Sequence, residues 1–213
     1  MELLNLTLLE ELWLGKNKIE RISGLSGLAS LRRLDVQSNR LTTIDGLLDS
    51  SVASTLEELY LSHNAITDEG AISGLLSSSN DDTTSSSSSS PFTMLTTLDL
   101  SRNRLTCTKP FSELTTLEDL WISGNDVKTF NDIDELRLLT NLDSVYLEYN
   151  PLDKEFEYRK RLAEMIPSLT QIDANKIGGN GWGGYSGGVF DLAERMRLMQ
   201  DAAIERARKM ETS

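Results

Sequence analysis

Apolar residues recur along this chain at fixed offsets from an asparagine. From Leu9 onward they follow the order LxxLxLxxN, and the same order begins again five more times before residue 152. The asparagines that close these six segments are Asn17, Asn39, Asn64, Asn103, Asn125 and Asn150. Four of the five intervals between them are 22 or 25 residues long, and the remaining interval is 39. Six in-phase copies with a period in this range predict a solenoid of stacked repeats.

Each repeat divides into parts with different expected structures. The LxL portion alternates buried and outward positions, which predicts a short strand with one buried face. The asparagine turns the chain off the strand, and its amide can satisfy backbone groups of adjacent coils. The remaining stretch of about ten residues, apolar at every third position, suits a 3₁₀ or helical turn on the outer face. Period and pattern are those of leucine-rich repeats, so we expect an α/β leucine-rich-repeat solenoid with a parallel β-sheet on its concave side.

The long interval between Asn64 and Asn103 contains a serine-rich insertion near residues 77–91, with the sequence SSSNDDTTSSSSSSP. A polar run without aromatic residues cannot offset its ordering entropy by burial, so we expect it to be disordered. We place it on the outer or descending side, where it leaves the stack intact. A phosphorylation role is open, but a tolerated loop expansion is the favoured interpretation.

The two ends of the chain depart from the repeat, which we assign to residues 1–152. Residues 153–175 contain an amphipathic segment rich in Lys and Arg, expected to be the C-terminal cap over the last row of the core. A Gly-rich linker at 176–189 and a tail helix at 190–213 follow; the helix either docks on a partner or lies solvated on the domain. Because residue 1 already lies in the outer segment of a repeat with no cap ahead of it, we expect an N-terminally truncated product.

Charge and composition narrow the class of partner. The chain has 21 Lys and Arg against 33 Asp and Glu, a net charge of −12. This argues against nucleic-acid binding and against an acidic membrane surface, and it favours a basic protein partner. With one cysteine, Cys107, no internal disulfide is possible, and neither an apolar run of membrane-spanning length nor a signal peptide is evident. We expect an intracellular protein, nuclear or cytosolic.

Two columns of residues should point out of the concave sheet. The fifth position of LxxLxLxxN is occupied by Trp13, Asp35, Tyr60, Asp99, Trp121 and Tyr146. The third position is occupied by Glu11, Arg33, Glu58, Thr97, Asp119 and Ser144. Large rings with polar ends are enriched at interface hot spots. Four aromatics interleaved with acids in one column therefore favour a protein interface over rings that only cover neighbouring sheet.

Nothing in the chain indicates catalysis. Carboxylates such as Asp99 and Asp119 could act as acid and base only in a concave pocket with shifted pKa values, which an open sheet does not provide. One histidine, His63, and one cysteine are too few for a metal site, and the Gly-rich stretch lacks the context of a phosphate-binding loop. We expect no cofactor, no metal, no small-molecule substrate and no enzymatic activity.

Six segments carry a more specific resemblance: LWLGKNKI at 12–19, VQSNRLT at 36–42, LYLSHNAI at 59–66, LDLSRNRL at 98–105, VYLEYNPL at 145–152 and EYRKRLAEMIPSLTQIDA at 157–174. Over residues 3–175 the chain resembles the leucine-rich-repeat regulatory subunits of protein phosphatase 1. The resemblance implies a nuclear and cytoplasmic scaffold that binds the catalytic subunit of protein phosphatase 1 through its concave face. Carried over by position, the contacts are Trp13, Asp99, Asp119, Trp121 and Tyr146, with Tyr60 and Asp35 in the same column.

This chain departs from that family in three ways. The family carries about twice as many repeats, the serine-rich insertion interrupts the series, and the linker and tail helix lie outside the matching region. A leucine-rich-repeat scaffold of another complex, such as a spliceosomal ribonucleoprotein component, is the alternative within binding proteins. An axonemal or tubulin-folding repeat protein is also conceivable, and an enzyme is the remaining class.

Overall fold

The computed structural model describes residues 6–48, 51–75 and 90–177. The core of the serine-rich insertion, nearly all of the Gly-rich linker and the whole tail helix lie outside these residues, so those expectations stay predictions. The assignment of residues 1–152 to repeats and 153–175 to a cap is likewise retained as a prediction of domain boundaries.

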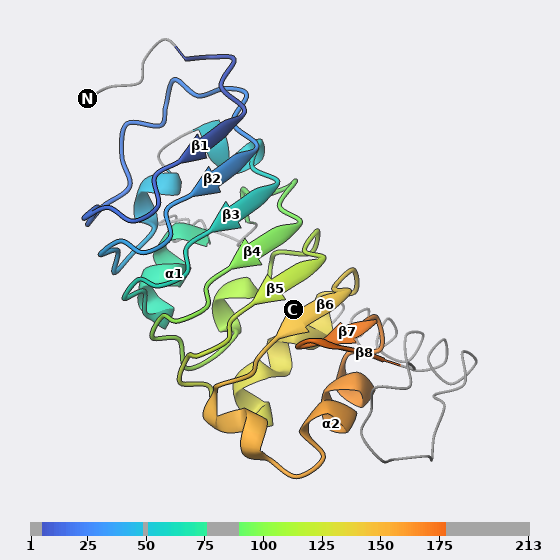
Figure 1. Ribbon diagram of the computed structural model, residues 1–213. Helices are drawn as coiled ribbons and strands as arrows, with labels where there is room; N and C mark the ends of the chain where they lie inside the picture. The colour runs from blue at the N-terminus through green and yellow to red at the C-terminus, as the bar shows by residue number, and fades with distance from the viewer. Residues whose placement is uncertain (1–5, 49–50, 76–89, 178–213) are drawn as a thin grey trace, which may run out of the picture.

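Each LxL segment forms one short strand of a single continuous sheet. The six strands are β1 (Glu11–Trp13), β2 (Arg33–Asp35), β3 (Glu58–Tyr60), β4 (Thr97–Asp99), β5 (Asp119–Trp121) and β6 (Ser144–Tyr146). They lie side by side in chain order, all parallel, with equivalent residues of successive repeats paired. Figure 1 shows the strands stacked along the length of the molecule. The predicted leucine-rich-repeat solenoid with a parallel sheet is confirmed.

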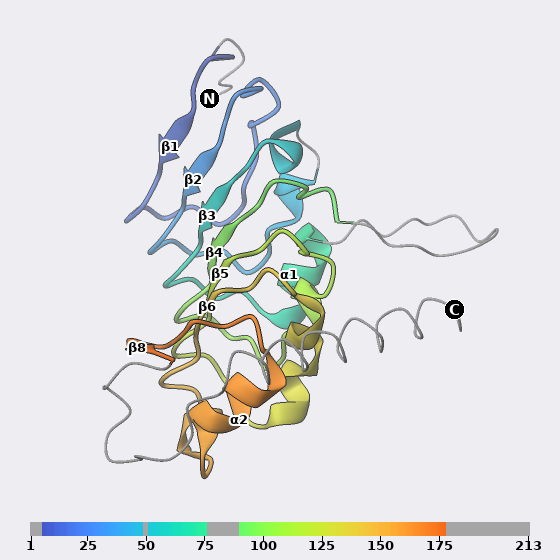
Figure 2. The same ribbon diagram turned by 90° about the vertical axis from the view of Figure 1, so that its right-hand side faces the viewer.

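Short helical segments occupy the opposite side of the solenoid, as the three-residue apolar spacing predicted. They are the 3₁₀ segments η1 (Asp45–Leu47), η2 (Ser51–Ser54), η3 (Lys109–Phe111) and η4 (Phe130–Leu138), and the helix α1 (Asp68–Leu75). Figure 2 shows the strands along one side and these helices along the other. The central residue of each strand is apolar and points between the two layers, and Leu34, Leu59, Leu98, Leu120 and Val145 are completely buried.

The repeated asparagines form a ladder that joins successive turns. Asn125 shows the pattern: its Nδ2 donates to the carbonyls of Leu100 and Ile122 at 3.0 and 2.9 Å, and its Oδ1 accepts from the Leu105 backbone N–H at 3.0 Å. Asn39, Asn64, Asn103 and Asn150 make equivalent bonds to the preceding repeat. These side chains therefore satisfy backbone groups that the stack removes from water, as expected.

The flanks of the serine-rich insertion meet on the helical side of the solenoid. The chain leaves the described residues at Leu75, the end of α1, and returns at Ser90, whose hydroxyl donates to the Leu75 carbonyl at 3.0 Å. Phe92 then enters the core with 2% of its surface exposed. The described flanks of the insertion therefore lie away from the sheet, and β3 pairs with β4 in the ordinary register.

A different arrangement closes the C-terminal end. After β6 come η5 (Pro151–Lys154), the helix α2 (Tyr158–Met165), and two short strands, β7 (Gln171–Ile172) parallel to β6 and β8 (Asn175–Lys176) antiparallel to β7. The side chain of Asp173, fully buried, accepts the backbone N–H groups of Leu147 and Glu148, both at 3.0 Å, and an Arg159 guanidinium N–H at 3.0 Å. A carboxylate here takes the unpaired donors at the end of the sheet.

Sequence reasoning missed Asp173, although a signal was present. It lies 23 residues after Asn150, within the repeat period. An aspartate continuing the asparagine series marks the position where an all-acceptor side chain ends the ladder.

Candidate protein-binding surface

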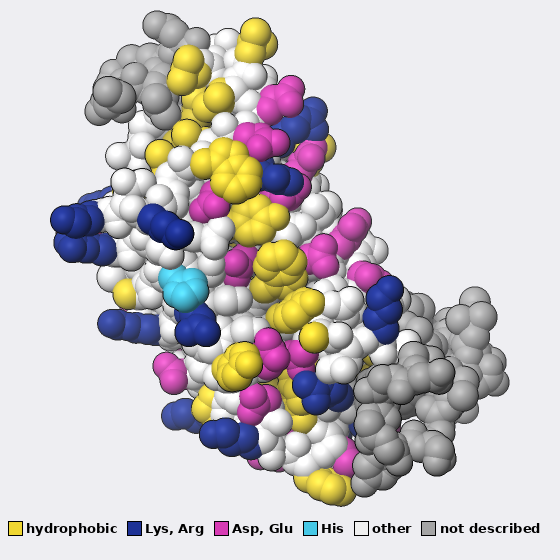
Figure 3. Space-filling model, viewed as in Figure 1, with side chains coloured by type: hydrophobic (Ala, Val, Ile, Leu, Met, Phe, Trp, Pro, Cys, Tyr) yellow, Lys and Arg dark blue, Asp and Glu magenta, His cyan; other side chains and the backbone are white. Residues whose placement is uncertain are grey.

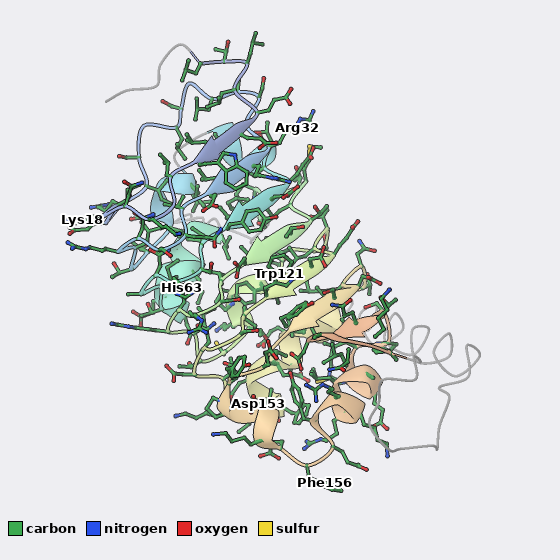
Figure 4. All side chains as sticks on the ribbon, viewed as in Figure 1. Lys18, Arg32, His63, Trp121, Asp153 and Phe156 are labelled. Carbon is green, nitrogen blue, oxygen red and sulfur yellow. The ribbon has the colours of Figure 1, made fainter. Side chains whose placement is uncertain are left out.

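Four aromatic side chains form a continuous band along the concave sheet, which we call the aromatic stripe: Trp13, Tyr60, Trp121 and Tyr146. Each is the last residue of its strand. The Trp121 ring contacts Tyr60 at 6.1 Å between centroids and Tyr146 at 6.0 Å, with interplanar angles of 49° and 71°. Figure 3 shows the stripe as a line of apolar side chains down the middle of this face, and Figure 4 places Trp121 at its centre.

The stripe stays partly accessible to solvent. Trp13 keeps 58% of its surface exposed, and Tyr60, Trp121 and Tyr146 are half-buried. The indole Nε1–H of Trp121 is shielded from solvent and finds no acceptor among the described residues. A buried donor without an acceptor costs free energy.

The two aspartates of the fifth column have a local structural role. Asp35 accepts the backbone N–H of Gln37 at 2.9 Å, and Asp99 accepts that of Ser101 at 2.9 Å. Both are buried, with 6 and 7% exposed. Tyr60 and Trp121 lie on β3 and β5, so their rings meet across the intervening strand, above Asp99. Aspartate side chains commonly accept the backbone N–H two residues further along the chain. An aspartate at the end of a strand is therefore the signal for this turn in the sequence.

At the N-terminal end of the stripe, polar groups hold the rings in place. Arg33 lies 5.7 Å from the Trp13 ring centroid and donates to Glu58 at 2.6 Å, and the Tyr60 hydroxyl donates to the same carboxylate at 2.6 Å. Burial alone would raise the pKa of Glu58, but the hydrogen bonds from Arg33 and Tyr60 and the Arg33 charge outweigh it and lower that pKa. The one cation of the predicted columns is therefore neutralised within the face.

Tyr60 should titrate at unusually high pH. Burial, and then its hydrogen bond to Glu58, raise the pKa of Tyr60 to about 12. A raised folded-state pKa means that the stabilisation by this hydroxyl is complete below pH ~10, the unfolded value, and is lost as pH rises toward 12. We expect the ultraviolet difference titration of wild type against Tyr60→Phe to show one phenol ionising near 12.

In the Glu58→Gln variant the pKa of Tyr60 should be lower than in the wild type, because the Glu58 carboxylate no longer raises it. The difference titration of Glu58→Gln against Glu58→Gln/Tyr60→Phe measures that pKa. A Tyr60 ionisation at the ordinary value of about 10 in the wild type would show that the hydroxyl does not bond Glu58.

An acidic edge, made up of Glu57, Glu58, Glu118, Asp119 and Asp143, runs beside the stripe at the N-terminal ends of the strands. Burial raises the pKa of Asp119, opposed by a hydrogen bond from Ser144, while the charges of Asp143 and Glu118 raise it further. A hollow of about 400 Å³ opens on the same edge, with Glu57 and Glu118 among its lining residues. Clustered carboxylates next to exposed rings suit a partner that presents Lys or Arg side chains beside an apolar surface.

The groups considered for chemistry are not assembled into a reactive site. His63 is exposed at a turn with φ 57°, and Cys107 is half-buried, with burial raising the pKa of its thiol. In the described ranges, no three His, Cys, Asp or Glu side chains are grouped to hold a metal ion. The search of those ranges also finds no helix of the length and apolar character that a membrane crossing needs.

Comparisons with known proteins agree with this geometry. Models of leucine-rich repeats match residues 7–49, described as two copies, residues 52–73, and residues 94–115. Among solved structures, a leucine-rich-repeat protein of Leptospira interrogans superposes with a TM-score of 0.57 and 25% identity, covering 78% of this chain and 37% of that one.

Curated proteins with similar sequences are named as regulatory subunits of protein phosphatase 1. The Protein phosphatase 1 regulatory inhibitor subunit PPP1R7 homolog of Arabidopsis thaliana is 38% identical over 123 residues, covering 58% of this chain and 32% of the relative. The Protein phosphatase 1 regulatory subunit SDS22 of Schizosaccharomyces pombe is 43% identical over 67 residues, 30% of this chain and 20% of the relative. Over the aligned residues this chain is similar to regulatory subunits of protein phosphatase 1.

The aligned part of this chain covers about a third or less of the length of each of these relatives. The names of these relatives describe regulatory subunits, and the described part of this chain is a leucine-rich-repeat solenoid. The positions predicted for partner contact all lie on the concave sheet. Asp35 and Asp99 use their carboxylates to hold a backbone turn, whereas the four aromatic residues and Asp119 do not.

Proposed function

We propose that this chain is a non-catalytic regulatory subunit that binds the catalytic subunit of protein phosphatase 1 through the aromatic stripe and the acidic edge. The observation that carries the proposal is the contact of Tyr60, Trp121 and Tyr146 on an otherwise polar sheet face. Exposed ring clusters of this kind are the usual centres of protein interfaces. The printed names of the relatives supply the identity of the partner.

The parts of the surface have different roles in this proposal. Trp121, flanked by Tyr60 and Tyr146, is the central contact and offers the exposed part of its ring to the phosphatase. Trp13 extends the stripe and Asp119 pairs with a basic group. Asp35 and Asp99 act mainly by holding their turns, since each carboxylate is buried against its own backbone.

Truncating the central ring is the direct test. We expect Trp121→Ala to weaken binding of the phosphatase catalytic subunit by at least about 2 kcal/mol, roughly thirtyfold, as at other aromatic hot spots. Isothermal titration calorimetry measures the difference, with circular dichroism to show that the variant is folded. Asp119→Ala should have a smaller effect, because its ion pair is only partly desolvated.

Phe156→Ala is the matched control. Its ring is 78% exposed near the C-terminal cap, away from the stripe, so its removal should leave the affinity unchanged. Equal losses in Phe156→Ala and Trp121→Ala, or a folded wild type that does not bind, would contradict the proposal. Binding of a spliceosomal protein in place of the phosphatase would favour the alternative scaffold.

We further propose that the protein works as a scaffold in the nucleus and cytoplasm, where a phosphatase regulator meets its partner. Imaging of a fluorescent fusion tests this location. Phosphatase activity followed during the titration shows whether binding stimulates or inhibits, and the chain alone should release phosphate only at the background rate.

A further inference from the structure

Basic side chains gather on one edge of this acidic protein. They lie in the loops after β1 to β4, directly before or after the ladder asparagine, and we call them the basic ridge: Lys16, Lys18, Arg40, His63, Arg102 and Arg104. All six are exposed. Figure 3 shows them along the side of the concave face opposite the acidic edge. In Figure 4, Lys18 and His63 lie to one side of Trp121 and Arg32 lies to the other.

The backbone of each repeat explains why these residues stand at the rim. The residue before the asparagine adopts the left-handed conformation, with φ values of 58° at Lys16, 57° at His63 and 53° at Arg102. This turn is held from below by the asparagine side chain, so the residues on either side cannot point into the core. Because the strands pair in register, the rim positions of successive repeats form columns along the edge.

Four of the ridge cations lack an ion pair within the described residues, in contrast to the arginines of the acidic edge. Only Arg40 has a carboxylate nearby, Glu20 at 3.8 Å, whereas Lys16, Lys18, Arg102 and Arg104 form no ion pair with the described residues. On the acidic edge, by comparison, Arg32 pairs with Glu57 and Arg33 with Glu58. Exposed cations without an ion pair therefore gather at the ridge, even though the whole chain carries −12.

We propose that the basic ridge is a second docking surface, continuous with the aromatic stripe, which binds an acidic segment of the protein held on the concave face. The inference rests on the proposed function, since it needs a partner on the sheet. From Lys16 to Arg102 the ridge spans three strand spacings, about 14 Å. Four or five residues of extended chain cover that length, which suits a short run of Asp and Glu.

The charge distribution favours an acidic protein segment over a nucleic acid. A long polyanion would extend beyond the ridge and meet the repulsion of the acidic edge and of the net charge of −12. Exposed ion pairs are individually weak, so the ridge acts best on a segment whose local concentration is raised by tethering to a protein already bound. Opposite charges on the two edges also orient that protein on the stripe.

The test compares two triple variants that remove the same charge. The ridge variant is Lys18→Gln/Arg102→Gly/Arg104→Gln; glycine is chosen because Gly124, with φ 67°, occupies the position equivalent to Arg102 in the next repeat. The control variant is Lys109→Gln/Arg137→Gln/Lys160→Gln, on η3, η4 and α2. We expect the ridge variant to bind the phosphatase catalytic subunit about fivefold more weakly at ~50 mM salt, with the difference shrinking at ~300 mM. The control variant should match wild type.

A second measurement separates this inference from the proposed function. Fluorescence anisotropy follows binding of a labelled Asp/Glu-rich peptide of about ten residues and of a single-stranded RNA of equal length. Peptide binding that falls in the ridge variant and persists in Trp121→Ala supports the ridge, even if the phosphatase does not bind wild type. Equal phosphatase affinity of the ridge and control variants at both salt concentrations overturns the proposal, as does RNA bound at the ridge more tightly than the peptide.

Discussion

Asn125→Ala is expected to lower the free energy of unfolding by about 3 kcal/mol, because the Leu105 N–H loses its acceptor and the carbonyls of Leu100 and Ile122 each lose one of two asparagine donors. The amide of Asn125 reaches the carbonyls of Leu100 and Ile122 and the N–H of Leu105. The Asn125 side chain is only 5% exposed, so water does not readily replace its hydrogen bonds in the variant. Urea unfolding followed by circular dichroism measures the change.

Asn17→Ala is the control at the same position of another repeat. Asn17 is exposed and donates only to carbonyls of its own turn, those of Leu14 and Gly15. It lacks the bond to a preceding repeat, so we expect a loss below about 1 kcal/mol. Similar losses at Asn17 and Asn125 would mean that the asparagine stabilises the local turn and not the joint between repeats.

The second large effect is expected at the C-terminal end of the sheet. Asp173→Ala should lower the free energy of unfolding by about 3 kcal/mol, since the N–H groups of Leu147 and Glu148 and the Arg159 guanidinium all lose their acceptor. Alanine also fits poorly at φ 53°, where aspartate and asparagine are tolerated. Thermal and urea unfolding both report the loss.

Two further variants divide this effect into its causes. Asp173→Asn keeps an oxygen for the backbone donors and the left-handed backbone but loses the charge opposite Arg159, so an intermediate loss of about 1–2 kcal/mol is expected. Glu157→Ala removes only an exposed pair with Lys160 and should cost under about 0.5 kcal/mol. A wild-type stability in Asp173→Ala would show that the cap helix, and not this carboxylate, closes the sheet.

The cap also bears on the binding surface. Gln171 of β7 donates to the Tyr146 hydroxyl at 2.6 Å, which fixes the last ring of the stripe. Loss of the Asp173 bonds loosens the edge against which β7 pairs. The proposed partner should therefore bind Asp173→Ala more weakly, although that residue touches no part of the stripe.

Much of this protein follows from its sequence alone. The LxL strands, the asparagine turns, the helical outer side and the outward columns were predictable, because a periodic sequence imposes the same burial direction on every repeat. Leu98 and Leu120 are buried for the same reason as Leu34. The family resemblance that the repeat segments carry is likewise supported by the relatives.

Only the tertiary structure decided how the columns interact. Tyr60 and Trp121 meet across a strand because Asp99 folds back on Ser101, and that depends on the register and spacing of three repeats together. The pairing of Asp173 with Arg159 depends on the packing of α2 against the end of the sheet. Periodicity determines which way a side chain points. The distant residues that it contacts depend on the packing between repeats. For this reason carboxylates of the acidic edge form ion pairs with Arg32 and Arg33, while the basic ridge has one ion pair, between Arg40 and Glu20, among the described residues.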